Sequence, residues 1–175
     1  MFKLGVCFLA SIAAVLVAMP PFIEYLKKLS FKQSVSEYAL DDDKKKAGTP
    51  IMGGVLFIIV PVIITLIASP HEFVEIDTLT IILAFAGYGL IGFVDDYLIA
   101  VKKNNEGLTP KQKFSMQMIL AVLFFLLYRS HATLDIRLFS GRVIQLGFLY
   151  FFLVVFMFTG SSNAVNLTDG MDGLA

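Results

Sequence analysis

Apolar residues along the chain are gathered into five blocks separated by polar segments. A membrane-spanning helix needs about 20 apolar residues, with a range of roughly 17 to 25. The blocks approach that length, although the fourth is short and needs flanking residues to complete a crossing. The expected spans lie near residues 4–23, 51–68, 79–94, 114–128 and 143–160. This pattern predicts an all-α polytopic membrane protein of about five transmembrane helices, forming a single transmembrane domain over residues 1–175.

Composition agrees with a membrane protein. Hydrophobic residues make up 57% of the chain and charged residues 16%, whereas soluble proteins average about 45–50% apolar and roughly 25% charged residues. An ordinary water-soluble domain is therefore excluded. The 14 basic and 14 acidic side chains balance, so net charge gives no indication of a nucleic-acid partner. The single cysteine, Cys7, lies in the first apolar block, which excludes disulfides and cysteine metal clusters.

The placement of Lys and Arg predicts the orientation. Ten of the 14 lie in the polar segments that follow the first and third spans, and the other four lie at the N-terminus and in the fourth link. Because cytoplasmic loops carry the positive excess, the N-terminus is expected outside and the C-terminal segment inside. Three polar segments then meet on the cytoplasmic face: Asp41–Gly54, Val94–Lys113 and Ser161–Ala175.

Asp95 and Asp96 directly follow the third apolar block, where the hydropathy pattern places the C-terminal end of a helix. Carboxylates at such an end are disfavoured by about 0.3–1 kcal/mol each, so a compensating cation is expected. Mg²⁺ suits this position because it takes oxygen ligands, often one or two carboxylates together with substrate phosphates. Two interpretations stay open at this point: a metal-binding catalytic pair, or a polar boundary of the membrane.

A second polar group lies near the end of the chain. Asn166, Asp169 and Asp172 recur every three residues, so in a helix they share one face, which Asn163 extends. Their side chains could hydrogen-bond a sugar or a base. The alternative is a solvated surface turn.

The start of the fourth span is well marked in the sequence. Thr109 and Gln112 fit a capping box, and Pro110 suits the first helical position. Lys113 then lies one turn into the helix, near the lipid headgroups. There it could neutralise a phosphate, or it could extend to the membrane surface as an ordinary flanking lysine.

Two other patterns carry less functional weight. Gly87–Gly92 fits G-x-G-x-x-G, but it lies inside an apolar block, so close helix packing is the better interpretation. His71 and His131 lie in or near the outer links and have no partnering motif. Both histidines are expected to be solvated.

Three cytoplasmic motifs together resemble the phospho-N-acetylmuramoyl-pentapeptide transferase family, and TPKQK precedes the fourth span as in that family. The motifs are GTPIMGG (Gly48–Gly54), GFVDDY (Gly92–Tyr97) and NAVNLTDGMDGLA (Asn163–Ala175). The resemblance extends from Lys44 to the end of the chain. Their order along the chain makes it highly specific.

The resemblance implies a ten-helix, multi-pass enzyme of the bacterial plasma (inner) membrane with its active-site motifs on the cytoplasmic face. Such enzymes transfer phospho-MurNAc-pentapeptide from UDP-MurNAc-pentapeptide to undecaprenyl phosphate, giving lipid I and UMP with Mg²⁺, the first membrane step of peptidoglycan synthesis. It makes Asp95 and Asp96 the catalytic pair. Asp96 is taken as the metal ligand, although the residues alone leave the division of roles open. The implied substrate-binding residues are Lys46, Lys113, Asn166, Asp169 and Asp172.

The chain ends about five spans in, so it resembles the N-terminal half of that family, which continues through a third aspartate and a histidine-rich loop. Activity of the chain by itself is therefore in question. Alternatives are another polyprenyl-phosphate UDP-HexNAc-1-phosphate transferase or an inactive truncated fragment. An inverted-repeat transporter would place ionisable residues near the middle of its spans, and these spans hold none. The expected surroundings are a lipid bilayer without nucleic acid, and a homodimer is left open.

Overall fold

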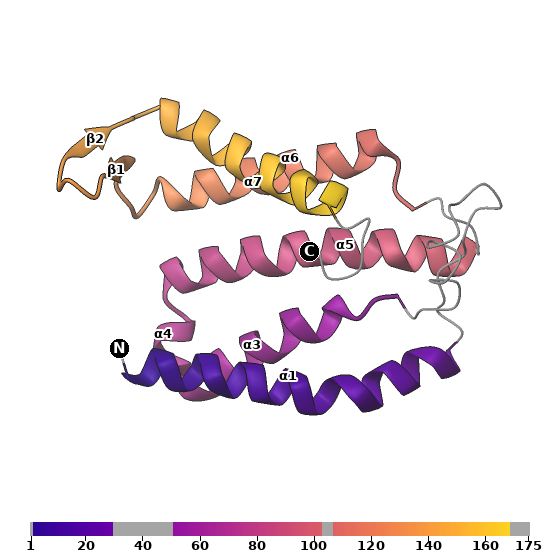
Figure 1. The fold of residues 1–175 in the computed structure, drawn as a ribbon. Helices are drawn as coiled ribbons and strands as arrows, with labels where there is room; N and C mark the ends of the chain where they lie inside the picture. Colours follow the sequence, from indigo (N-terminus) through magenta and orange to yellow (C-terminus); the bar gives the residue numbers. More distant parts are fainter. Residues whose placement is uncertain (1, 30–50, 103–106, 169–175) are drawn as a thin grey trace. The chain divides into compact units, whose positions relative to one another are not determined.

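The structure is a computed structural model that describes residues 2–29, 51–102 and 107–168. Within these ranges the chain is almost entirely helical, as the sequence predicts (Figure 1). The helices are α1 (Phe2–Lys28), α3 (Gly54–Ala68), the short α4 (Pro70–Phe73), α5 (Ile76–Lys102), α6 (Pro110–Tyr128) and α7 (Leu149–Thr168). A small hairpin of β1 (Asp135–Arg137) and β2 (Val143–Gln145) separates α6 from α7.

Residue contacts divide the chain into two compact units, and α5 contributes to both. The first unit comprises Met1–Glu75 and Gly89–Thr109, and the second comprises Ile76–Tyr88 and Pro110–Ala175. The expected aspartate pair therefore belongs to the first unit, whereas Lys113 and the described part of the C-terminal motif belong to the second.

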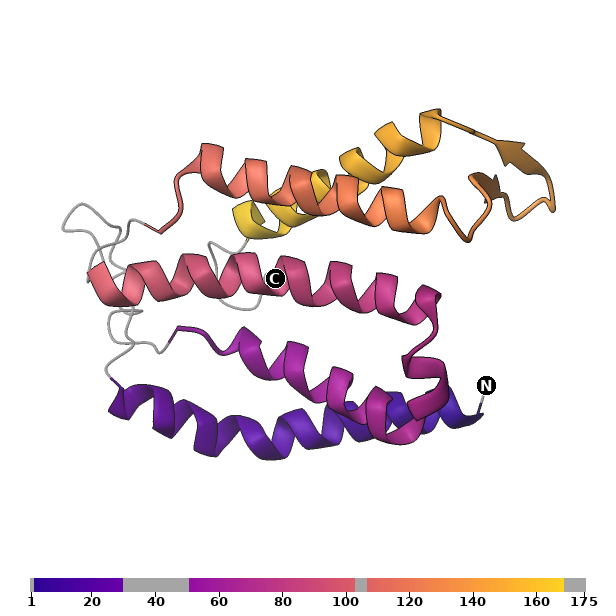
Figure 2. The ribbon, with the colours of Figure 1, turned by 180° about the vertical axis from the view of Figure 1, so that it is seen from behind.

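In the first unit α1 packs beside α3, which both views of the ribbon show (Figures 1 and 2). Helix α5 approaches α3 closely at Gly89, where an added Cβ would overlap the Cδ1 atom of Ile58 and lie 2.8 Å from its Cγ1. In the second unit an added Cβ at Gly87 would lie 2.9 Å from the Cδ1 of Leu120. These two glycines confirm that the G-x-G pattern serves close helix packing.

One end of the first unit is held by an ion pair between α1 and α4. The Lys3 ammonium lies 3.2 Å from a carboxylate oxygen of Glu72. A hydrogen bond from the Glu72 backbone, followed by the hydrogen bond from Lys3, lowers the pKa of Glu72 below its usual value. The start of α1 and the link after α3 therefore lie at the same end of this unit, as two successive crossings require.

In the second unit α6 and α7 lie side by side (Figure 1). Gln117, Ala121 and Phe125 form a buried stripe along α6, with the four-residue spacing that places side chains on one helix face. Aromatic rings fill the interface: the centroids of Phe125 and Phe151 are 5.2 Å apart. Edge-to-face and offset ring pairs at such distances stabilise packing beyond their buried area.

The helix boundaries differ from the apolar blocks at two places. Helix α5 continues past Val94 to Lys102, because no glycine or proline follows the block to end the helix. The fifth block begins as strand β2, whose Val143 pairs with Arg137 of β1, and α7 starts only at Leu149. Gly147, with φ of +50°, separates the strand from the helix. A short apolar run by itself does not distinguish strand from helix.

In the described part of the chain three stretches are long and apolar enough to cross a membrane: Lys3–Lys28, Ile76–Lys102 and Leu149–Asn166. Helix α3 is apolar but shorter. Large apolar side chains such as Val17, Ile67 and Phe156 are more than two-thirds exposed, which suits contact with lipid rather than water. The number of crossings and the orientation stay predictions.

The contact at Gly89 can be tested with a glycine on the same helix as its control. Gly89→Ala should be less stable than Gly92→Ala by about 1–3 kcal/mol, because the new methyl group overfills the space held by Ile58, whereas Gly92 has open space around it. Unfolding in detergent micelles measures the difference. Adding Ile58→Val, which removes the Cδ1 atom, should restore stability, and equal stability of the two alanine variants would refute the packing role.

Candidate functional site

Asp95 and Asp96 lie inside α5, not at its C-terminal end, since the helix continues to Lys102. The expectation that a helix dipole disfavours these carboxylates is therefore wrong, because that effect is confined to the last turn. Both side chains are half-buried in the first unit. Successive residues on a helix point about 100° apart, so the two carboxylates face different neighbours.

Each aspartate accepts a hydrogen bond from the backbone of a different interhelical segment. Asp96 Oδ2 accepts from the N–H of Met52, 3.1 Å away and two residues before α3. Asp95 Oδ1 accepts from the N–H of Leu108, 2.8 Å away and two residues before α6. Hydrogen bonds to an ionised acceptor are roughly twice as strong as neutral ones. We refer to this arrangement of Asp95, Asp96, Met52 and Leu108 as the aspartate clasp.

The Met52 side of the clasp has an unusual backbone. Met52 has φ of +74°, in the left-handed region that non-glycine residues rarely adopt, and its side chain is only 6% exposed. Such a conformation costs of order 1–3 kcal/mol and persists only where the surroundings fix it. The bond to Asp96 and the buried side chain both hold Met52 in place, so the GTPIMGG motif is fixed against α5 at this residue.

The Leu108 side of the clasp depends on the absence of a side chain at Gly107. A Cβ on Gly107 would overlap Asp95 Oδ1 and lie 3.1 Å from the Asp95 carbonyl oxygen. Only glycine allows the backbone to come so near the carboxylate. Gly107 was not among the predicted site residues, and its separation of 12 positions from Asp95 gives no local sequence signal.

The second unit contains the other predicted residues that the structure describes. Lys113 lies half-buried in the first turn of α6, which begins at Pro110 as the capping pattern predicts. Asn163 and Asn166 lie inside α7, the former half-buried and the latter exposed, so they share one helical face as expected. The predicted Lys46, Asp169 and Asp172 lie outside the described residues.

A buried amide that sequence reasoning missed joins α6 to α7. Gln117 is 1% exposed; its Nε2 donates to Ser162 Oγ at 3.0 Å and its Oε1 accepts from Asn163 Nδ2 at 2.8 Å. The available signal was a lone amide inside an apolar block, four residues after Lys113. A fully satisfied buried polar group of this kind specifies one arrangement of its neighbours.

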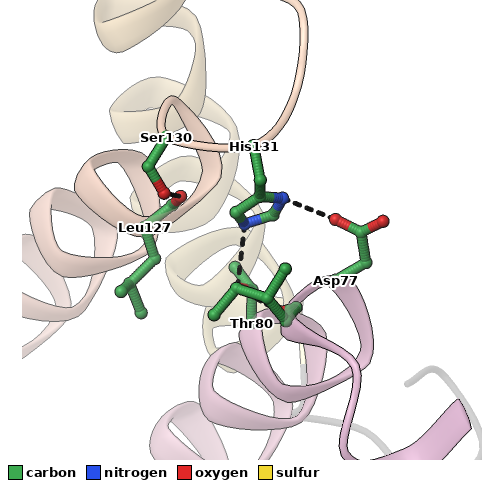
Figure 3. Close-up of polar contacts among 6 residues, drawn as sticks. Asp77, Thr80, Leu127, Ser130 and His131 are labelled. Carbon is green, nitrogen blue, oxygen red and sulfur yellow. Dashed lines mark hydrogen bonds and ion pairs between the residues drawn. The ribbon is translucent and has the colours of Figure 1, made fainter.

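The expectation for His131 is wrong, because its side chain is largely buried and partnered (Figure 3). Nε2 lies 3.3 Å from the Thr80 hydroxyl, and Nδ1 lies 2.5 Å from a carboxylate oxygen of Asp77. The ring also packs against Tyr128. These contacts join the start of α5 to the segment after α6, an arrangement that the sequence could not indicate because the partners are about 50 positions apart.

Within the described residues, no group of three or more His, Cys, Asp and Glu side chains could hold a metal ion. Among the described residues, the half-buried carboxylates of Asp95 and Asp96 are the side chains best suited to bind a metal ion. Mg²⁺ is commonly held by one or two carboxylates, with the remaining positions filled by water and substrate phosphates. This pair fits that ion only as part of a site that a phosphate substrate completes.

The apolar helices and the polar residues at their ends define a polytopic helical membrane protein. Residues 78–175 match the sequence profile of glycosyl transferase family 4, more than half of the chain. The chain belongs to that family.

Curated relatives carry a more specific name. The chain is 47% identical over 178 aligned residues to the phospho-N-acetylmuramoyl-pentapeptide-transferase of Staphylococcus epidermidis, covering 96% of this chain and 55% of that protein. The proteins of the same name from Bacillus mycoides and Bacillus thuringiensis are 44% and 43% identical, and each alignment covers 97% of this chain and 52% of the relative. The chain thus spans about half the length of the curated relatives it matches.

The aspartate clasp predicts a difference between alanine and asparagine substitutions. Asp95→Ala or Asp96→Ala should lower the free energy of unfolding by about 1.5–3 kcal/mol, the usual contribution of a hydrogen bond to a charged group. Asparagine retains an acceptor oxygen, so Asp95→Asn and Asp96→Asn should lose less. Unfolding in micelles and hydrogen exchange at the Met52 and Leu108 amides measure these effects.

Asp135→Ala provides the control, because the Asp135 carboxylate accepts only an exposed bond from Thr133 among the contacts described. This variant should change stability by less than about 0.5 kcal/mol. Unchanged exchange at both amides in the alanine variants would show that the clasp does not hold the two segments.

Proposed function

We propose that this chain provides part of the active site of an enzyme that transfers phospho-MurNAc-pentapeptide from UDP-MurNAc-pentapeptide to undecaprenyl phosphate, giving lipid I and UMP. The observation that carries this proposal is the 43–47% identity, over 96–97% of the chain, to proteins named for that transferase. The aspartate clasp supports it, since two half-buried carboxylates are fixed where interhelical segments meet.

The reaction exchanges one diphosphate (phosphoanhydride) bond for another. An oxygen of the acceptor phosphate attacks the phosphorus bonded to the sugar, the bond from this phosphorus to the bridging diphosphate oxygen breaks, and UMP leaves with that oxygen. Phosphoryl transfer of this kind depends mainly on positioning and on neutralising charge. In our proposal one aspartate of the clasp takes the proton of the acceptor phosphate, so that its oxygen can attack.

The other aspartate, assigned here to Asp96, would help to hold Mg²⁺. A carboxylate has two oxygens and accepts several bonds, so a backbone N–H and a metal ion can share one aspartate. When bound, Mg²⁺ supplies positive charge to the diphosphate. The clasp prevents the carboxylates from turning away, because each is attached to a backbone N–H on a separate segment.

The described residues proposed to bind the donor belong to the second unit. The Lys113 ammonium would neutralise a donor phosphate, and the exposed Asn166 amide would hydrogen-bond the nucleotide. Lys46, Asp169 and Asp172 are proposed to join them on the strength of the motifs in which they lie. The enzyme would work in the bacterial plasma membrane, with these residues at the cytoplasmic face.

Orientation is supported by charge and by the first unit. The Lys3–Glu72 pair places the start of α1 and the link after α3 at one end. The clasp joins the segments before α3 and before α6, and ten of the 11 lysines lie within residues 27–46 or 102–113. Both observations agree with a cytoplasmic clasp and an external N-terminus.

The proposal can be tested with this chain and with a chimera in which it replaces the matching part of the Staphylococcus epidermidis relative. In bilayers containing undecaprenyl phosphate, the chimera should release UMP from UDP-MurNAc-pentapeptide, should stop with EDTA and should resume with Mg²⁺. UDP-N-acetylglucosamine as donor tests the alternative sugar specificity. A correctly inserted chimera that releases no UMP would overturn the proposed function, and release by the chain itself would show that its own residues suffice.

In the active chimera, Asp95→Asn and Asp96→Asn should each reduce turnover by at least about 10³-fold, a loss of about 4 kcal/mol in transition-state stabilisation. Asparagine keeps an acceptor for the backbone N–H but not the charge, so membrane insertion and stability should remain. Asp135→Asn, a change outside the proposed site, should retain normal turnover. Near-normal turnover in both aspartate variants would refute the catalytic assignment.

A reporter joined to either end tests the proposed orientation. A tag before Met1 should be digested by protease added outside intact cells, and a tag after Ala175 should be protected, because the lysine-rich segments stay in the cytoplasm. Lysed cells, in which both tags are digested, provide the control. Protection of the N-terminal tag together with digestion of the C-terminal tag would reject the orientation.

A further inference from the structure

Gln117 links α6 to α7 in the second unit, close in sequence to residues that we propose bind the donor substrate. Its side-chain amide uses both ends on α7, donating to Ser162 Oγ at 3.0 Å and accepting from Asn163 Nδ2 at 2.8 Å. The Tyr88 hydroxyl of α5 donates to the backbone carbonyl oxygen of Gln117 at 2.9 Å. With 1% of its surface exposed, Gln117 has its amide fully enclosed by the helices that it joins.

The contacts between α6 and α7 define an antiparallel register. Moving along α6 from Gln117 through Phe124 to Tyr128, the partners on α7 move back from Asn163 through Phe158 to Tyr150. The two ring pairs have centroid distances of 4.8 and 5.6 Å. The start of α6 and the end of α7 lie at the same end of this helix pair (Figure 1).

Extending this register by one turn leads to the expectation that Lys113 and Asn166 lie at the next level. Lys113 lies four residues before Gln117 on the same face of α6, and Asn166 lies three residues after Asn163 on the same face of α7. Each is about one turn, or roughly 5 Å, beyond the amide contact. The bonds of Gln117 therefore determine which residue of α7 lies level with Lys113.

The aromatic contacts cannot fix this register by themselves. Burial of apolar surface is non-directional, so rings can repack if one helix slides along the other. A slide of one turn would break the bonds of the buried Gln117 amide to Ser162 and Asn163, and a buried polar group without a hydrogen bond is costly. A single buried amide is known to select helix register in this manner in coiled coils.

We propose that Gln117 is a positioning residue: its amide fixes the register of α6 against α7 and thereby brings Lys113 and Asn166 level to bind the phosphate and nucleotide end of the donor. The register follows from the contacts above, and the identity of the ligand rests on the proposed function.

The register is tested without activity by cross-linking in the membrane-embedded chain. In a background with Cys7→Ser, cysteines at positions 113 and 166 should react with a short bifunctional thiol reagent, since packed helices lie about 8–10 Å apart. Adding Gln117→Leu should slow this cross-link by at least about fivefold. It should also allow cross-links from position 113 to positions on α7 that lie one turn from position 166, as expected when a buried polar contact is lost. Phe125→Leu reduces the packing of the same helices but leaves the amide intact, so it should retain the original cross-link.

The donor site is tested by kinetics in the chimera. Gln117→Leu should raise KM for UDP-MurNAc-pentapeptide by about tenfold, which is a loss of donor binding, and change KM for undecaprenyl phosphate by less than about twofold. Phe125→Leu should lower the unfolding temperature without altering donor KM. The double variant Gln117→Asn with Asn163→Gln retains the combined length of the two amides and should recover donor KM in part, which also serves if Gln117→Leu fails to fold.

The outcomes separate the two proposals. An unchanged cross-link pattern and unchanged donor KM in Gln117→Leu, with lower stability only, would make Gln117 a merely structural residue and overturn this inference. If the chimera transfers nothing, the proposed function fails, whereas the cross-linking result still decides the register.

Discussion

The arrangement of the first unit depends on two carboxylates, each bonded to a backbone N–H of a different interhelical segment. Asp96 fixes the entry into α3 and Asp95 fixes the entry into α6. A half-buried carboxylate oxygen that has lost part of its contact with water is stabilised by such a donor. The left-handed backbone of Met52 and the absence of a side chain at Gly107 both allow these hydrogen bonds to form. Asp95 and Asp96, whose carboxylates suit phosphate chemistry, therefore also fix the segments that lead into α3 and α6.

Much of the fold follows from hydropathy, because long apolar runs in a chain this poor in charge can hardly form anything but helices. The helix ends follow less well. Asp95 and Asp96 end an apolar block without ending the helix, since Tyr97 through Lys102 continue with residues that a helix accommodates. Val143 and Ile144 read equally well as strand or helix, and their pairing with β1 decided the matter.

The candidate site was accessible from sequence where charge or a motif marked it. The sequence placed Asp95 and Asp96 at a helix end and predicted a compensating cation, whereas they lie inside α5 and accept bonds from backbone N–H groups of distant segments, which no local pattern records. Gln117 was overlooked, and His131 was wrongly predicted to be solvated, for a related reason. A single amide or imidazole becomes informative only when its partners, such as Asn163 or Asp77, are known to face it.

The order of residues in the aspartate clasp has a consequence for biosynthesis. Its bonds span 44 and 13 positions, and every partner precedes Pro110. A growing chain therefore presents the complete clasp before the helices of the α6–α7 pair have left the ribosome, and domains synthesised first generally fold first. Both carboxylates can thus gain their backbone hydrogen-bond donors while the later helices are still being translated.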